Sequence, residues 1–249
     1  MKKSFTPLAA LIGLVISFSS CRSTFLLKED FQGDVIGNRP IKNVPGDPAG
    51  DSISYTSVLN PRLVMQASTV SAGRKALVFS ETSIPGATAF NQWLSFKGIV
   101  SDYSQPIWFY WTAKQRSSQT DILIDIMGVQ GLWVTRLKIR PNGQLIRVIN
   151  FANEATVDVL GTFNPEQTHT IIISLQPTAR KYNITVFGLS GSASSGNRTN
   201  LDVFSAPNPM SPIHSFAKPS IHFRYLDAAF SATPAYVFEG VYITRKQPD

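Results

Sequence analysis

The sequence predicts an all-β protein that folds as a two-sheet antiparallel jelly-roll sandwich. Runs of apolar, β-branched and aromatic residues of strand length recur from residue 63 to residue 244, and Gly, Pro and Asn turn signals separate them. Beyond the N-terminal segment no stretch shows apolar residues at helical spacing, so the helical crossovers of an α/β fold have no candidates. Sandwiches of about 200–250 residues commonly form a single domain.

The expected strands follow one another at short spacing. They cover residues 25–27, 76–79, 93–100, 107–111, 122–127, 132–139, 144–149, 156–160, 169–175, 182–187, 221–225 and 236–244. Pro141, Asn142 and Gly143 form a turn signal between two alternating segments. Residues 22–62 predict a tether followed by loops. Residues 189–220, rich in Ser, Gly, Asn and Pro, predict a long loop that is either functional or disordered.

The first 21 residues resemble a bacterial lipoprotein signal. Lys2 and Lys3 precede an apolar run over residues 8–18, which is shorter than the roughly 20 residues that span a bilayer. Two serines then precede Cys21, the single cysteine of the chain, although Phe18 stands where the lipobox usually has Leu. We therefore expect residues 1–20 to be a signal peptide and Cys21 to be lipidated. The alternatives are a buried thiol or an ordinary signal peptide.

This interpretation sets the expected domain organisation and location. Residues 21–28 form a lipid-anchored tether, and residues 29–249 form one β-sandwich domain. Several acyl chains on Cys21 would anchor the protein stably in a membrane. Arg22 follows the cysteine, where an aspartate tends to retain lipoproteins of Gram-negative bacteria on the inner membrane. We therefore expect the outer membrane, either at its periplasmic face or at the cell surface.

Composition and motifs exclude several function classes. The chain carries a formal charge of +7, but it has no compact basic cluster with interleaved aromatics, so nucleic-acid binding has no support. A basic surface favours acidic polysaccharides or anionic lipid headgroups, or is simply an ordinary solvated surface. Three histidines without metal-ligand spacing give no zinc site. The nucleophile-elbow, phosphate-loop and dinucleotide-binding motifs do not occur.

Calcium has one candidate loop. Residues 46–51 hold Asp47 and Asp51 close together, and calcium accepts oxygen ligands in flexible geometry. The alternative is an ordinary turn rich in Asp and Gly. We therefore expect structural calcium, if it binds at all, at Asp47 and Asp51.

Aromatic residues give the main indication of a ligand. In the strand over residues 107–111, Trp108 and Tyr110 point to one face and Phe109 and Trp111 to the other. Sugars stack their apolar ring faces on such side chains. The outward pair therefore predicts a sugar platform, with Trp133 as a possible neighbour. The alternative is that these aromatics serve only the core.

Three segments resemble the concanavalin A-like lectin and glucanase superfamily. They are an early strand over residues 29–34, a central block over residues 93–187, and a last strand over residues 236–243. The resemblance implies a jelly-roll sandwich and a role in carbohydrate binding or hydrolysis.

The catalytic strand of that superfamily's laminarinase-type enzymes is incomplete in this chain. It carries Glu, an apolar residue, Asp, two apolar residues and Glu. Here Asp125 matches the central aspartate, but Leu123 and Gly128 replace the two essential carboxylates. Asp121 lies on the same strand face about 13 Å away, farther than the roughly 5–9.5 Å that glycoside hydrolysis needs. These two aspartates therefore cannot form the catalytic pair, but a carboxylate of another strand, such as Asp102 or Glu81, could still approach Asp125. Otherwise Asp125 contacts a glycan, or it sits at a strand end or caps a turn.

We expect a noncatalytic glycan-binding module on a lipid anchor. The predicted carbohydrate-binding residues are Trp108, Tyr110, Trp111, Trp133 and Asp125. Two alternatives remain open. One is a glycosidase or polysaccharide lyase with non-standard catalytic residues, and the other is an envelope module that binds another protein.

Overall fold

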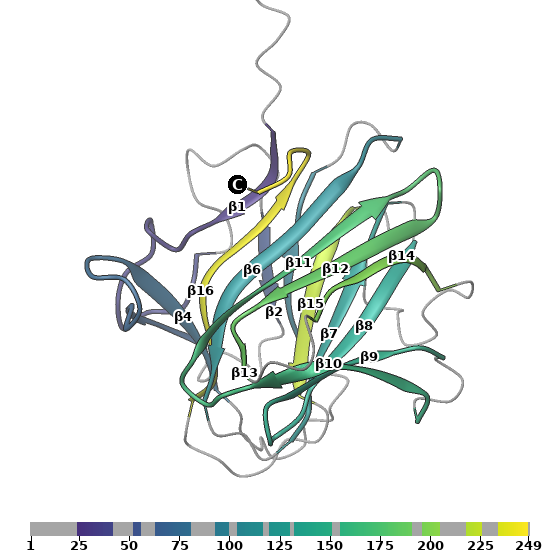
Figure 1. Ribbon diagram of the computed structural model, residues 1–249. Coiled ribbons are helices and arrows are strands. Elements are labelled where there is room, and N and C mark those ends of the chain that lie inside the picture. The colour runs from purple at the N-terminus through teal and green to yellow at the C-terminus, as the bar shows by residue number, and fades with distance from the viewer. Residues whose placement is uncertain are drawn as a thin grey trace, which may run out of the picture.

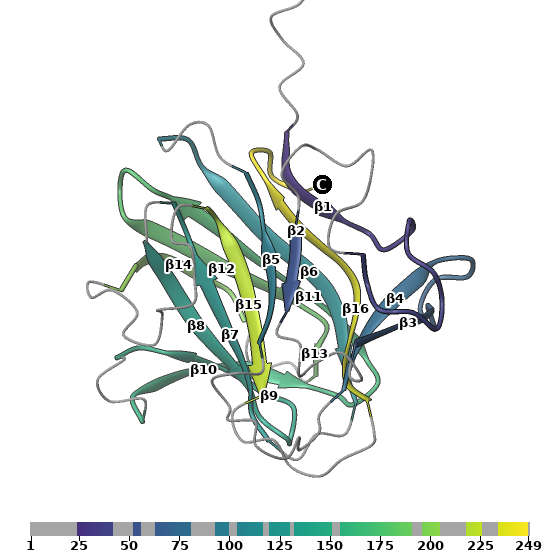
Figure 2. The ribbon, with the colours of Figure 1, turned by 180° about the vertical axis from the view of Figure 1, so that it is seen from behind.

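A computed structural model of the chain contains two antiparallel β-sheets of eight strands each (Figures 1 and 2). The structure describes residues 24–41, 52–55, 63–80, 93–99, 104–116, 120–129, 132–150, 155–190, 196–204, 218–225 and 234–248. These residues form sixteen strands and no helix. The predicted two-sheet jelly-roll sandwich is thereby confirmed. The signal segment, Cys21, Asp47 and Asp51 lie outside the described residues.

The first sheet, sheet A, contains both the first and the last strand of the described chain (Figure 1). Its order is β14 (Arg198–Asp202), β12 (Lys181–Phe187), β11 (Thr168–Gln176), β6 (Ile107–Gln115), β16 (Pro234–Thr244), β4 (Lys75–Ser80) and β3 (Leu63–Ala67). β1 (Phe25–Glu29) also pairs with β16. The two ends of the described chain therefore meet on one sheet.

The second sheet, sheet B, packs behind sheet A and faces the viewer in Figure 2. Its order is β13 (Leu189–Ser190), β10 (Val157–Phe163), β9 (Gln144–Val148), β8 (Trp133–Ile139), β7 (Ile122–Met127), β15 (Ser220–Tyr225), β5 (Trp93–Lys97) and β2 (Ser52–Tyr55). β7 and β8 are buried along their whole length, so both faces of sheet B are shielded there.

The core lies between the inner faces of the two sheets. Alternate residues of β11 and β12 point inward, which explains the period-two pattern of burial in both strands. Phe223 is central, with ring centroids 5.6 Å from Trp111 and 4.6 Å from Phe238. Each such fully buried apolar side chain stabilises the fold by about 1.5–3 kcal/mol.

The long loop predicted over residues 189–220 was wrong in part. It contains β13 and β14, and β15 begins at its last residue, Ser220. β14 pairs with β12, and Asn200 N donates to Asn183 Oδ1 at 2.8 Å. The polar residues Arg198, Thr199 and Asn200 thus belong to an edge strand, whereas residues 191–195 and 205–217 lie outside the described part of the chain.

The predicted early strand over residues 29–34 was also wrong in part. β1 ends at Glu29, and Phe31 has a left-handed φ of 61°. Asp34 N then donates to Phe31 O at 3.2 Å, which closes a turn. In the loop-rich region over residues 22–62, the short strand β2 also went unpredicted.

The predicted turn after β8 is confirmed. Asn142 Oδ1 accepts from Gln144 N at 3.0 Å, and Gly143 has a φ of 80°. A Cβ at Gly143 would lie 2.3 Å from the carbonyl oxygen of Phe163, so no other residue fits there.

Within the described part of the chain, no helix is long and apolar enough to cross a membrane.

Candidate functional site

The aromatic residues of β6 divide between the core and the surface. Phe109 and Trp111 are fully buried, and Trp111 Nε1 donates to Tyr236 Oη at 3.0 Å. Trp108 and Tyr110 are half-buried on the outer face of sheet A. The predicted division into two pairs is therefore correct, and Trp111 belongs to the core rather than to a surface.

Tyr110 is held in place by its neighbours on adjacent strands. The register sets it opposite Tyr242 of β16 and Ile172 of β11. The rings of Tyr110 and Tyr242 stack with centroids 4.7 Å apart and planes 14° apart, and Phe25 lies 6.3 Å from Tyr242. Burial raises the pKa of Tyr242, and a hydrogen bond with Arg74 opposes this only in part. The Tyr242 phenol is therefore neutral at physiological pH.

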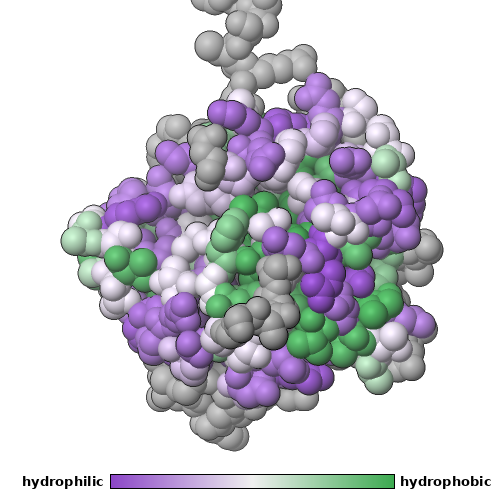
Figure 3. All heavy atoms as spheres, viewed as in Figure 1, coloured by the Kyte–Doolittle hydropathy of each residue, from purple (hydrophilic) through white to green (hydrophobic). Residues whose placement is uncertain are grey.

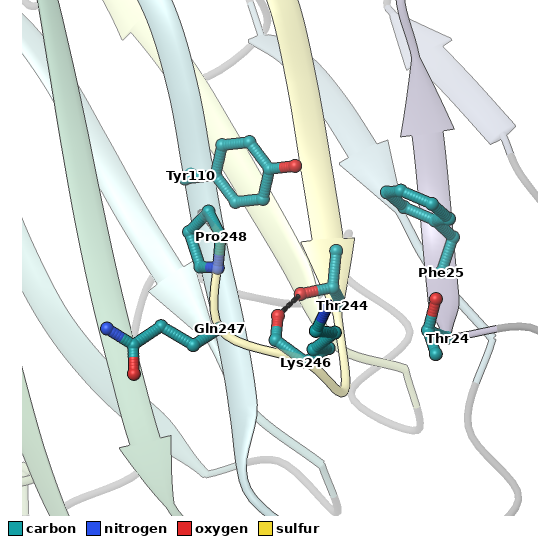
Figure 4. Close-up of a pocket in the computed structure, with 7 residues that line it drawn as sticks. All are labelled: Thr24, Phe25, Tyr110, Thr244, Lys246, Gln247 and Pro248. Carbon is teal, nitrogen blue, oxygen red and sulfur yellow. Dashed lines mark hydrogen bonds between the residues drawn. The ribbon is translucent and has the colours of Figure 1, made fainter.

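A pocket of about 340 Å³ opens beside Tyr110, where β1 begins and β16 ends (Figure 4). It is lined by Thr24, Phe25, Tyr110, Thr244, Lys246, Gln247 and Pro248. The lining thus combines two aromatic rings, three hydroxyls, one amide and one ammonium group. The volume lies near the lower end of the roughly 300–1,000 Å³ typical of small-molecule sites.

Hydrogen bonds to backbone carbonyls fix the walls of this pocket. Arg245 N donates to Thr24 O at 2.7 Å, and Arg245 Nη1 donates to Gln105 O at 2.8 Å. Thr244 Oγ1 donates to the carbonyl of Lys246, so residues 246–248 turn back past the end of β16 toward Tyr110 (Figure 4).

In the space-filling view of this side, hydrophobic residues reach the surface near the middle, between hydrophilic ones (Figure 3).

The outer face of sheet B holds a different arrangement, a polar row across four neighbouring strands. The register aligns Ser95 of β5, His222 of β15, Asp125 of β7 and Arg136 of β8. Their exposed fractions are 0%, 4%, 5% and 0%. The row is flanked on the same face by Trp93, Lys97, Leu123, Met127, Trp133, Lys138, Ser220 and Arg224.

Asp125 is engaged by both of its oxygens. Arg136 Nε lies 2.6 Å from Oδ1 and Arg136 Nη2 lies 2.8 Å from Oδ2, while Arg224 Nη2 lies 3.9 Å from Oδ2. The expectation that Asp125 sits at a strand end or caps a turn was wrong, because Asp125 lies inside β7 in a buried ion pair. It is the only carboxylate among the described strand residues on this face, so these residues supply no pair for glycoside hydrolysis.

The basic residues of this face lie among its aromatic rings. The Arg136 guanidinium lies 5.0 Å from the Trp133 ring, and Lys97 Nζ lies 5.6 Å from the Trp93 ring. Burial lowers the pKa of Lys97, and Lys218 adds to the effect. His222 Nε2 and Ser220 Oγ are 2.7 Å apart. His222 and Arg224 lie on the outer face of their strand, beside Asp125 and Leu123 of β7.

Another histidine, His169, lies inside the sandwich. His169 Nε2 and Tyr236 Oη are 2.8 Å apart, and the His169 ring stacks on Phe163 at 3.8 Å. Burial lowers the pKa of His169 to about 3 and raises the pKa of Tyr236. Both groups are neutral and enclosed, so they serve the core rather than a surface site.

The predicted carbohydrate-binding residues occupy three separate places. Trp108 and Tyr110 lie on the outer face of sheet A, Asp125 and Trp133 lie on the outer face of sheet B, and Trp111 lies between the sheets. One site cannot contain all five. The described residues hold no group of three potential metal ligands. Calcium at Asp47 and Asp51 stays a prediction, since both residues lie outside the described part of the chain.

Sequence reasoning missed most of the pocket lining. Phe25, Thr244, Lys246 and Gln247 come from opposite ends of the chain and meet only because β1 pairs with β16. Periodicity identifies both strands but does not say which strands pair. The sequence offers only a weak indication of this pocket, which is the polar residues that directly follow the last predicted strand.

No sequence profile of a known family matches the chain, and neither does any curated protein. The fold is similar to the catalytic domain of a GH131 β-glucanase from Podospora anserina, at 10% identity and TM-score 0.55, over 91% of this chain and 97% of that domain. It is also similar to the binding domain of botulinum neurotoxin serotype D, at 12% identity and TM-score 0.50, over 91% of this chain and 48% of that one.

A sialidase aligns at 13% identity and TM-score 0.44, over 74% of this chain and 17% of its own. The chain thus spans about half the length of the neurotoxin binding domain and a smaller part of the sialidase. The similarity to the glucanase domain and to the neurotoxin binding domain, at TM-scores of 0.55 and 0.50, shows a shared antiparallel β-sandwich fold.

Proposed function

We propose that this protein is a noncatalytic glycan-binding module and that a sugar binds in the pocket beside Tyr110. The observation that carries the proposal is the lining of that pocket, which combines the aromatic rings of Tyr110 and Phe25 with hydroxyl, amide and ammonium groups around about 340 Å³. A sugar offers an apolar ring face for stacking and hydroxyls for hydrogen bonds. The pocket supplies partners for both.

Preorganisation supports the same choice. Tyr110 is stacked on Tyr242, and Thr24 is tied to Arg245, so neither wall has to be ordered when a ligand arrives. Binding to a preformed site avoids about 0.5–1.5 kcal/mol for each side chain that would otherwise become immobilised. Trp108 is paired with Thr244 on the same face and extends the aromatic surface beside the pocket.

The ion pair of Asp125 argues against hydrolysis. Asp125 is held by two short contacts to a fully buried Arg136, and the described strand residues of this face include no second carboxylate for the pair that glycoside hydrolysis needs. The polar row on sheet B remains the second candidate surface for a glycan, because Trp93 and Trp133 flank it. Its near-complete shielding from solvent makes it the less favoured one.

The proposal includes export and lipid anchoring at Cys21, which the signal-like segment over residues 1–20 supports. We expect cells fed an alkyne analogue of palmitate to label the wild-type protein and not the Cys21→Ala variant. The mature wild-type chain should begin at Cys21 by mass spectrometry. Equal labelling of both proteins, or a mature chain that begins elsewhere, would contradict anchoring at Cys21.

A glycan array tests the binding proposal. Wild-type protein, shown to be folded, should give saturable binding with and without calcium, and Tyr110→Ala should abolish it. Phe187→Ala is the matched control, because Phe187 is also an exposed aromatic residue of sheet A but lies three strands from β16. Absence of binding by the folded wild type, or equal binding by Tyr110→Ala, would overturn the proposal.

A further inference from the structure

We infer that the sugar in this pocket is the headgroup of a glycolipid in the same membrane that holds the lipid anchor. The inference rests on the proposed glycan binding and on lipidation of Cys21. Thr24 itself lines the pocket, and it lies three positions after Cys21 in the sequence. Because an extended chain spans at most about 3.6 Å per residue, the pocket wall lies within roughly 11 Å of the anchored cysteine.

The wall cannot move away from that position without breaking the sheet. Phe25 pairs with Thr244 in the β1–β16 ladder, and Arg245 N donates to Thr24 O at 2.7 Å. The tether between the anchor and the folded domain is therefore short, and it ends directly at the pocket. Lipidation would place the pocket within the headgroup layer.

The side chains at this end suit that layer. Tyr110, Trp108 and Phe25 are half-buried aromatics, and such residues are enriched at the interface between membrane and water. Lys246 is exposed, and Arg245 lies beside it on the same turn. Each basic residue near an anionic leaflet adds about 1 kcal/mol of attraction. The aromatic rings and the basic groups thus surround the pocket at the end closest to the anchor.

Tethering also removes the need for high affinity. Anchoring confines the pocket and a glycolipid of the same leaflet to one thin layer, and this raises the effective concentration of the ligand much as a short linker raises it to about the millimolar range. A small pocket with one stacking platform could therefore be occupied by a glycolipid of the same leaflet, even if the free sugar bound only at similar concentrations. Glycans on an opposing surface gain nothing from the tether.

Vesicles test the inference with the lipidated full chain. Phosphatidylcholine vesicles that contain nitroxide-headgroup lipid are prepared with lipopolysaccharide, with phosphatidylglycerol at matched charge, or with neither. The readout is the quenching of Trp108 fluorescence, taken as the difference between the wild type and Trp108→Phe. Trp108 is suitable because the other three tryptophans are at most 9% exposed.

We expect lipopolysaccharide to quench Trp108 severalfold more than phosphatidylglycerol does. Tyr110→Ala should reduce this quenching to the level seen with phosphatidylglycerol, and Phe187→Ala should leave it unchanged. Lipopolysaccharide in separate vesicles that lack the protein should cause no vesicle bridging. Equal quenching of Trp108 by both anionic lipids would overturn the inference. Clear bridging to the separate lipopolysaccharide vesicles would also overturn it, because the pocket would then bind glycolipid of an opposing membrane.

A parallel titration separates this inference from the proposed function. The lipidated chain in detergent is titrated with the delipidated oligosaccharide of the same lipopolysaccharide. Binding of the free oligosaccharide without enhanced quenching would leave glycan binding intact and refute recognition in the same membrane. Failure of the free oligosaccharide to bind, together with a negative glycan array, would refute both.

Discussion

The outer faces of the two sheets differ in the exposure of their side chains and in what these side chains contact. On sheet A, Trp108 and Tyr110 are half-buried beside a pocket of about 340 Å³. On sheet B, the polar row of Ser95, His222, Asp125 and Arg136 is at most 5% exposed. Both faces arise from the same alternation of residues along a strand. They differ in what the polar groups contact, because Asp125 and Arg136 bind each other whereas the pocket residues surround a hollow.

This difference separates two energetic roles. Removing one partner of a buried ion pair leaves an uncompensated charge, so the polar row should be sensitive to mutation whatever it binds. The exposed residues around the pocket, such as Lys246 and Gln247, can be changed with little damage to the fold. Stability measurements should therefore report on the core and on sheet B, and binding measurements should report on sheet A.

The largest expected effect is on stability, and it compares an inward-facing with an outward-facing tryptophan of β6. Trp111→Ala should lower the free energy of unfolding by about 3–5 kcal/mol, because it creates a cavity and leaves Tyr236 without its indole donor. Trp108→Ala should cost about 1 kcal/mol or less, because Trp108 lies on the outer face. Urea denaturation of both variants measures this. Similar losses for the two would contradict the assignment of faces.

The buried ion pair should give a loss of similar size. Asp125→Ala should destabilise the protein by about 3–5 kcal/mol, because it leaves the positive charge of Arg136, which is 0% exposed, without its carboxylate partner. The matched control is Asp202→Ala, which removes an exposed partner of Lys181 at 2.7 Å and should cost about 0–1 kcal/mol. Thermal unfolding distinguishes them. A mild effect of Asp125→Ala would mean that water or another group compensates Arg136.

Much of this contrast could be predicted from the sequence, and the rest could not. Alternation in residues 107–111 predicted that Trp108 and Tyr110 point away from Phe109 and Trp111, since the side-chain period of a strand is two. The sequence could not say which pair points inward, because both are aromatic. The partner of Asp125 was also hidden, because Arg136 lies on a neighbouring strand and strand register is a tertiary property.

A smaller effect should appear as a dependence of stability on pH. Burial lowers the pKa of His169 from 6.5 to about 3. Between these two pH values the imidazole is therefore protonated in the unfolded chain but stays neutral in the folded chain. His169 should therefore cost the protein nothing above pH 6.5. It should destabilise the fold progressively, by on the order of a few kcal/mol, as the pH falls toward 3. Urea midpoints measured across this range test the sign.

His169→Gln is the matched variant for that titration. It keeps a polar side chain beside Tyr236 but cannot take up a proton, so its stability should vary less between pH 6.5 and 3 than that of the wild type. An identical slope for both proteins would show that His169 is not the group responsible.

The smallest effect concerns a single hydrogen-bonding group of the pocket. Gln247→Ala should weaken glycan binding by about 0.5–1.5 kcal/mol, as expected for one hydrogen bond, and should leave the unfolding midpoint unchanged. Gln176→Ala, at an exposed position on the end of β11, is the control and should change neither quantity. Calorimetric titration with the best oligosaccharide from the array measures the difference. A loss of stability in Gln247→Ala would assign Gln247 to the fold instead.

The most direct test locates the ligand on one face. Amide chemical shifts of the full chain are recorded while the best oligosaccharide from the array is added. We predict shifts confined to residues 24–25, 108–112 and 244–248, which surround the pocket on sheet A. Shifts confined to residues 93–97, 122–127, 133–138 and 220–225 would place the ligand on sheet B and contradict the proposed site.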